Sequence, residues 1–105
     1  MKLFAIAITS AGLLAAAGSA AAAVSDVDYL KASRCRGLAE GGLTTVDTAA
    51  MDAFIKNEGR TRNAFVTERG KSEFDKAKRE TKTDNTDRKA RLVAELTGPC
   101  QAYKG

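Results

Sequence analysis

The sequence predicts a small all-α domain, a bundle of three or four helices stapled by one disulfide. Apolar side chains recur every three or four residues, which is the spacing of one helix face. Acidic residues repeatedly stand four positions before basic ones, the orientation that stabilises a helix. These pairs are Asp52 and Lys56, Glu58 and Arg62, Asp75 and Arg79, Asp84 and Arg88, and Asp87 and Arg91. No stretch alternates apolar and polar residues over a length that a strand needs, and 105 residues leave no room for a second domain.

Residues 1–23 are predicted to be a secretory signal peptide, which leaves residues 24–105 as the single helical domain. A positive charge at the second position precedes an apolar run and then an Ala-rich segment, the order typical of a signal that a peptidase removes. An uncleaved membrane anchor is the alternative, because residues 3–24 carry no charge. The small residues favour cleavage near Ala22 or Ala23. We therefore expect bacterial export to the periplasm or the medium, with no stable transmembrane anchor after cleavage.

The only two cysteines, Cys35 and Cys100, are predicted to form a structural disulfide. Export delivers them to an oxidising compartment, where one intramolecular pairing exists. Closing this loop would stabilise the domain by roughly 4 kcal/mol. A redox-active pair is the alternative, because Arg34 and Arg36 flank Cys35 and could lower the pKa of its thiol. The wide separation favours the structural bridge, since redox pairs usually have Cys-x-x-Cys spacing.

The first helix is predicted to begin at Ser25 and to end at Gly41. Ser25 and Asp28 have the spacing of a capping box, with Asp in the usual Glu position. Gly41 and Gly42 are typical of a left-handed C-terminal cap. Cys35 lies on the apolar arc of this helix, so we expect it to face the core.

A long second helix is predicted from Asp47, its N-cap, toward Lys82. Its apolar stripe comprises Met51, Phe54, Ile55, Phe65 and Val66. Gly59 and Gly70 are the two positions at which this helix would bend or break. Phe74 falls off the stripe, which favours at least one break.

The last helix is predicted to begin after Thr83 or Asp84 and to stop at Gly98 and Pro99. Its apolar seam comprises Leu92, Val93 and Leu96. The short tail that follows is predicted to fray, with Tyr103 as the residue that could pack.

The composition argues against an enzyme, a metal centre or a cofactor. The chain has no His, the commonest general base and zinc ligand. Two cysteines cannot supply a four-thiolate zinc site or an iron–sulfur cluster. The serines lack a nucleophile-elbow context, and no phosphate-binding glycine motif is present. We expect no catalytic residues, no metal ligands and no cofactor.

The leading functional hypothesis is binding to another envelope protein, as an inhibitor, an immunity-type factor or a chaperone. It rests on the predicted export, the helical bundle and the missing catalytic set. An exposed apolar patch between helices would support it, and the candidate residues are Met51, Phe54 and Phe65. The competing interpretation of the same stripe is ordinary core packing, which is the commoner role for such residues.

The alternative hypothesis is binding to a polyanion or an anionic membrane surface through residues 69–91. This segment holds nine basic residues against five acids, in a chain of net charge +4 at pH 7. The basic residues are Arg69, Lys71, Lys76, Lys78, Arg79, Lys82, Arg88, Lys89 and Arg91. Lipopolysaccharide, anionic lipid headgroups or an acidic protein would fit such a surface, whereas a solvated helix face with internal ion pairs is the simpler interpretation. Nucleic acid is disfavoured, because only Phe74 offers a stacking platform there.

Overall fold

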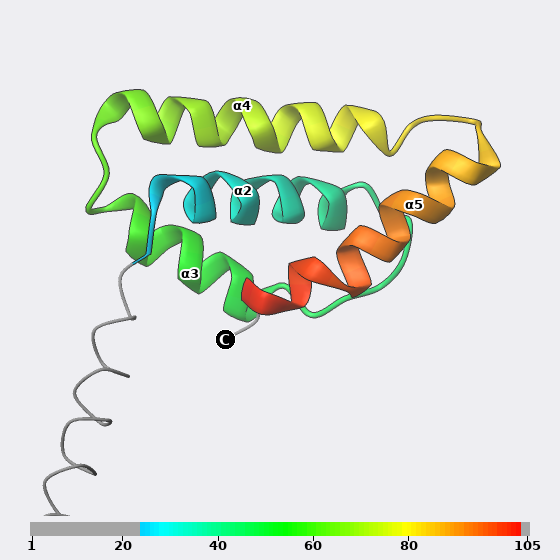
Figure 1. The fold of residues 1–105 in the computed structure, drawn as a ribbon, viewed down its shortest axis with the longest axis horizontal. Helices are drawn as coiled ribbons and strands as arrows, with labels where there is room; N and C mark the ends of the chain where they lie inside the picture. Colours follow the sequence, from blue (N-terminus) through cyan, green and yellow to red (C-terminus); the bar gives the residue numbers. More distant parts are fainter. Residues whose placement is uncertain (1–23, 104–105) are drawn as a thin grey trace, which may run out of the picture.

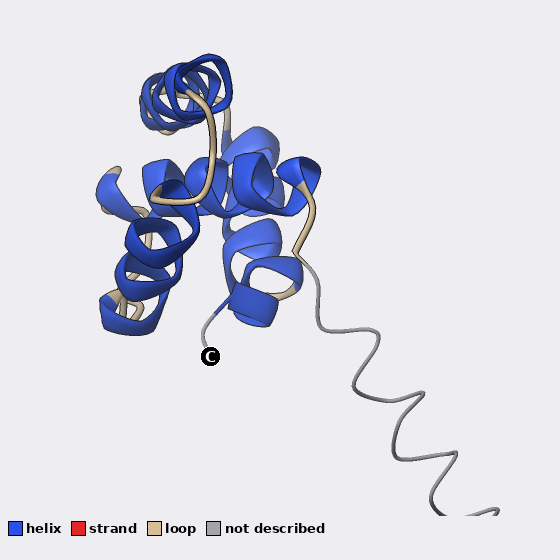
Figure 2. Ribbon diagram, turned by 90° about the vertical axis from the view of Figure 1, so that its left-hand side faces the viewer, coloured by secondary structure: helices blue, strands red, loops and turns tan. Residues whose placement is uncertain are grey.

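The computed structural model describes residues 24–103, and this range is all-helical, with four α-helices, one short 3₁₀ helix and no strand (Figures 1 and 2). In the numbering of Figure 1 these are α2 (Asp26–Glu40), α3 (Ala49–Gly59), α4 (Ala64–Glu80), α5 (Thr86–Thr97) and η1 (Pro99–Tyr103). The predicted all-α fold class is confirmed. The predicted signal peptide lies outside the described residues.

Helix α2 is the centre of the domain, and the other elements pack around it. Helix α4 runs alongside α2 in the same chain direction, while α3 and the α5–η1 segment are drawn below α2 in Figure 1 and contact it along other faces. The view along the helices in Figure 2 shows α4 above and two further layers below. Within the described range, no helix is both long enough and apolar enough to cross a membrane.

The close contact between α2 and α4 depends on small residues. A Cβ added to Gly37 would collide with the carbonyl oxygen of Phe74 and would lie 3.0 Å from the Cβ of Ala77. A Cβ on Gly41 would likewise collide with the side chain of Thr81. The two backbones approach closely because neither glycine places a side chain between them.

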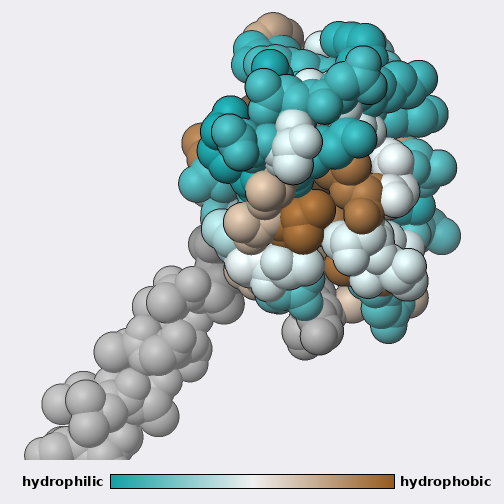
Figure 3. All heavy atoms as spheres, turned by 90° about the vertical axis from the view of Figure 1, so that its right-hand side faces the viewer, coloured by the Kyte–Doolittle hydropathy of each residue, from teal (hydrophilic) through white to brown (hydrophobic). Residues whose placement is uncertain are grey.

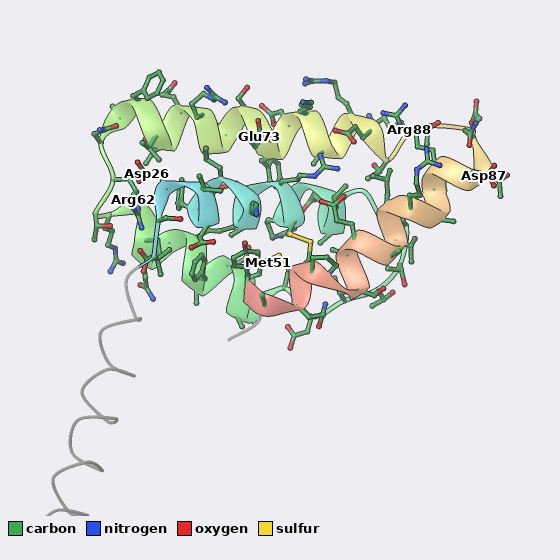
Figure 4. All side chains as sticks on the ribbon, viewed as in Figure 1. Asp26, Met51, Arg62, Glu73, Asp87 and Arg88 are labelled. Atoms are coloured by element: carbon green, nitrogen blue, oxygen red, sulfur yellow. A yellow bond between two sulfur atoms is a disulfide. The ribbon has the colours of Figure 1, made fainter. Side chains whose placement is uncertain are left out.

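The core lies between α2, α3, α4 and the C-terminal elements, and the disulfide runs through it (Figure 4). Cys35 and Cys100 are bonded, with their Cα atoms 5.6 Å apart, which confirms the predicted bridge. The buried cluster comprises Cys35, Leu38, Met51, Ala77, Leu92, Leu96 and Cys100. The bridge therefore joins the central helix to the segment that follows the last one.

Helix α2 begins and ends at the predicted residues, but the left-handed glycine is one position later than its C-cap. The Asp28 amide donates to Ser25 Oγ at 3.1 Å and the Ser25 amide donates to Asp28 Oδ2 at 3.3 Å, so the capping box is formed. The helix ends before Gly41, but the left-handed residue is Gly42, with φ of 77°.

The predicted long second helix is broken into two, and the break is at Gly59 and not at Gly70. Helix α3 ends at Gly59, and Asn63 caps α4 by accepting a hydrogen bond from the Val66 amide at 3.0 Å. Gly70 stays helical because it lies directly against Tyr29.

The predicted caps at Asp47, Thr83 and Asp84 are each replaced by a neighbouring residue. Thr48 is the N-cap of α3, although the carboxylate of Asp47 accepts from the Ala49 amide at 3.0 Å. Asn85 caps α5 by accepting from the Arg88 amide at 2.9 Å. The side-chain bond of Asn85 agrees with its role as the cap of α5. Thr48 makes no such bond, so the capping rule alone does not place the start of α3.

The end of the chain is more ordered than predicted. Helix α5 ends at Thr97 with Gly98 as its C-cap, which agrees with the predicted stop. Residues 99–103 then form η1 instead of a frayed tail. The ring of Tyr103 packs on Phe54 with centroids 5.4 Å apart, which ties η1 to α3.

Candidate functional site

All nine basic residues of the 69–91 segment are exposed, and none of them forms an ion pair within residues 24–103. We call these nine residues the basic face. Its residues lie on α4, on the turn that follows it and on α5. Figure 3 shows the end of the domain at this turn, where hydrophilic surface lies across the top and a small apolar area lies below it.

Helix geometry explains why the cations of α4 point outward. Val66, Gly70 and Ala77 are the buried residues of α4, and their spacing defines its inner face. At 100° per residue, Lys71 and Lys78 then lie along one edge of the helix. Arg69 and Lys76 lie along the other edge, with Arg79 between the two. The basic residues therefore flank the exposed surface of α4 and do not form a single stripe.

The three arginines outside the basic face that are partly buried are paired with carboxylates. Each of Arg34, Arg36 and Arg62 contacts two acids. The pairs are Arg34 with Glu80 (2.9 Å) and Glu95 (2.7 Å), Arg36 with Asp52 (2.5 Å) and Glu40 (3.0 Å), and Arg62 with Asp26 (2.7 Å) and Glu58 (2.8 Å). Figure 4 shows Asp26 beside Arg62. Of the acid–base pairs that the sequence spacing predicts, only Glu58 with Arg62 is formed among the described residues.

This pairing strengthens the positive character of the basic face. Glu80 belongs to the same 69–91 segment, but its carboxylate is turned toward Arg34 of α2. The hydrogen bonds from Arg34 hold the pKa of the Glu80 carboxyl below its ordinary value, so Glu80 stays ionised and engaged. Glu80 is bonded to Arg34, while Arg88 and Lys76 of the segment still act on its charge. The other acids of the segment are Glu73, Asp75, Asp84 and Asp87, and none of them forms an ion pair within residues 24–103.

Arg34 links three helices through a forked set of hydrogen bonds. Its Nε and Nη2 donate to Glu95 of α5 at 2.7 and 2.9 Å, and its Nη1 donates to Glu80 of α4 at 2.9 Å. The bonds to Glu95 and then those to Glu80 raise the pKa of Arg34 above its usual range. A hollow of about 330 Å³ is lined by Arg34, Glu80 and Glu95 together with Arg88, Arg91 and Leu92. Both of its carboxylates are occupied by Arg34, so the cluster is a structural brace.

The three residues predicted for an apolar partner surface do not form a common exposed patch. Met51 is 1% exposed and belongs to the core. Phe54 packs on Tyr103. Phe65 is 70% exposed at the start of α4. The break at Gly59 separates these side chains, because it places the two halves of the predicted stripe on different helices.

A groove that the sequence did not predict lies between α3 and α4 over α2. Its volume is about 520 Å³. We call it the α3–α4 groove. It is lined by Tyr29, Ser33, Arg36, Asp52, Ile55, Lys56, Thr67, Glu68, Gly70, Lys71 and Phe74. The position of Phe74 off the predicted stripe was the one sequence signal, since it places that ring on a different face from the core residues.

No protein-family model, curated protein or solved structure matches this chain. Its function is therefore inferred from its own residues. Within residues 24–103 no group of three or more His, Cys, Asp or Glu side chains is placed to hold a metal ion.

Proposed function

We propose that this protein is a non-catalytic, exported helical protein that binds phosphate-bearing anionic surfaces through the basic face of α4 and α5. The observation that supports the proposal is that all nine cations are exposed and outside the ion pairs of the described structure, while six carboxylates are held by three other arginines. Glu80 of the same segment bonds to Arg34 of α2, although Arg88 and Lys76 also act on its charge.

The energetics of such a surface are favourable and depend on salt. Each Lys or Arg near an anionic membrane surface contributes about 1 kcal/mol of attraction. The attraction decays over a Debye length of about 8 Å at physiological ionic strength. Several cations must therefore act together, and Lys71 with Lys78 on one edge of α4, or Arg69 with Lys76 on the other, are placed to do so.

The predicted export supports the choice of ligand. An envelope protein meets phospholipid headgroups and, in some bacteria, lipopolysaccharide, and phosphate is the group these ligands share. The hypothesis of an envelope protein partner remains a prediction. We rank it second because Met51, Phe54 and Phe65 do not form a common surface.

The direct test is binding of the full disulfide-bonded chain to vesicles of phosphatidylglycerol mixed with phosphatidylcholine. Vesicles of phosphatidylcholine alone control for insertion of the apolar N-terminal segment. A parallel titration with lipopolysaccharide distinguishes the two sources of phosphate. We expect binding to the anionic vesicles or to lipopolysaccharide, and a loss of at least tenfold in affinity between 50 and 300 mM salt, on the order expected when several charges are screened.

Variants separate the basic face from net charge alone. The double variant Lys78→Glu and Arg79→Glu should weaken binding about tenfold or more, because it reverses two charges on the face. The matched control is Lys31→Glu with Arg60→Glu, which changes the net charge equally at two exposed residues on α2 and next to α3. An equal loss in both variants, or equal binding to neutral vesicles, would overturn the proposal.

A further inference from the structure

We infer that the α3–α4 groove is a binding site for a small anionic amphiphile, a molecule with one acyl chain and a carboxylate or phosphate head. The groove does not depend on the basic face, although Lys71 belongs to both. The inference therefore goes beyond the proposed function and can fail separately from it.

The groove exists because α2 serves as a shared floor for two helices. Helix α4 packs on one side of α2 and α3 on another, and residues 60–63 join them at one end (Figures 1 and 2). The two helices diverge as walls above the floor. The volume of about 520 Å³ is within the range of about 300–1,000 Å³ that small-molecule sites occupy.

The inner surface of the groove is largely apolar. The ring of Tyr29 lies on the floor, and Gly70 of α4 lets that ring approach because it has no side chain. Ile55 of α3 and Phe74 of α4 line the two walls and are only half-buried. These two side chains would lose water-exposed surface against an acyl chain, which is the main source of affinity for an apolar ligand.

Unpaired cations lie on both walls of the same groove. Lys56 of α3 and Lys71 of α4 are exposed and form no ion pair with described residues. Arg36 and Asp52 also line the groove, but they pair with each other. Glu68 is the one lining acid outside an ion pair. The unpaired charges of the lining are therefore two cations and one anion, which favours an anionic head group.

A ligand that fits this groove needs both an apolar chain and a negative charge. An inorganic anion would contact the lysines but would leave Ile55 and Phe74 in water. A neutral apolar molecule would cover those side chains and gain nothing from Lys56 and Lys71. A whole helix from a partner protein is too large for the groove volume, whereas a single acyl chain with a charged end matches both features.

Titration with sodium dodecanoate below its micelle concentration, followed by NMR chemical shifts of the full chain, tests the inference. Acetate provides the head without the chain, and octanol provides a chain without the charge. We expect dodecanoate to shift the signals of Tyr29, Ile55 and Phe74, with weaker binding of octanol and none of acetate. Dodecyl phosphate then tells whether the site prefers phosphate or carboxylate.

The double variant with Lys56→Gln and Lys71→Gln should weaken dodecanoate binding about tenfold. The matched control is the double variant with Lys76→Gln and Lys89→Gln. The control removes two exposed cations of the basic face that do not line the groove. Absence of shifts at the groove, equal affinity for octanol, or an equal loss in the two double variants would overturn the inference. If the protein binds anionic vesicles but dodecanoate shifts no signals of the groove, only this inference is overturned. If dodecanoate shifts those signals but the protein does not bind anionic vesicles or lipopolysaccharide, only the proposed function is overturned.

Discussion

Gly70 of α4 lies directly against the ring of Tyr29 of α2, so that a Cβ at Gly70 would stand 2.8 Å from Cε2 of the ring and 3.0 Å from Ser33 Oγ. Tyr29 is 6% exposed and Ser33 is fixed by a 3.0 Å hydrogen bond to the Tyr29 carbonyl oxygen. The neighbours therefore have little room to move. This contact sets the distance between the two helices at the floor of the groove.

Gly70→Ala is expected to destabilise the domain by about 1–3 kcal/mol, because the added methyl group overpacks this contact. In an exposed helix the same change would stabilise by about 1 kcal/mol through helix propensity, so the sign distinguishes the two effects. Urea denaturation measures the free energy of unfolding. Ser72→Ala, on the exposed side of α4, is the control and should change it little. A Gly70→Ala protein more stable than the parent would contradict the close packing.

The Arg34 cluster predicts a pH dependence of stability. Hydrogen bonds from Arg34 lower the pKa of Glu80 in the folded state below its ordinary value of 4.5. The stabilisation that the ionised Glu80 carboxylate gives the fold is thus complete above pH 4.5, and it is lost as the pH falls through the folded-state pKa of Glu80. Arg34→Gln should lower the free energy of unfolding at pH 7 by about 1–3 kcal/mol. Below pH 4.5 the stability of this variant, measured by urea denaturation, should fall less steeply with pH than that of the parent.

Arg36→Gln is the control for that experiment. Arg36 also contacts two carboxylates, but Asp52 and Glu40 are 53% and 44% exposed. Surface pairs of this kind contribute about 0–1 kcal/mol. If both variants cost the same and show the same acid profile, Arg34 has no special role as the link between α2, α4 and α5.

The disulfide is expected to stabilise the C-terminal elements more than the rest. Replacing Cys35 and Cys100 with Ser should lower stability by about 2–4 kcal/mol and the melting temperature by at least about 10 °C. Amide exchange should accelerate first in η1 and the end of α5, because the bridge connects them to α2. Exchange that accelerates evenly over all helices would argue against this local role. Reductant should have no further effect on the variant.

The fold class could be predicted because the strongest signals are local. The capping box at Ser25, the stop at Gly98 and the pairing of the only two cysteines each depend on a few neighbouring residues or on simple counting, and all three are confirmed. The break in the middle was harder to place, since Gly59 and Gly70 are equal as local signals. What keeps Gly70 helical is a tertiary contact with Tyr29, which no sequence pattern displays.

The candidate site was predictable only as a composition. The sequence located the nine basic residues, but whether internal acids neutralise them depends on tertiary pairing. The α3–α4 groove was not predictable at all, because it requires Tyr29, Ile55 and Phe74 from three different helices to line one space. Long-range proximity of this kind follows from how α3 and α4 diverge over α2.

The contact between Tyr103 and Phe54 predicts a loss of stability at alkaline pH. Burial, followed by the nearby negative charge of Asp28, raises the pKa of Tyr103 in the folded state above its ordinary value of 10.0. The neutral phenol is favoured by folding, so its contribution is complete below pH 10 and is lost as the pH rises above it. Tyr103→Phe keeps the ring contact and should lose less stability than the parent between pH 9 and 11, measured by urea denaturation. Tyr103→Ala should be less stable at every pH, since it also removes the packing on Phe54. Parallel pH profiles of stability for the parent and Tyr103→Phe would show that folding does not bury the phenol of Tyr103.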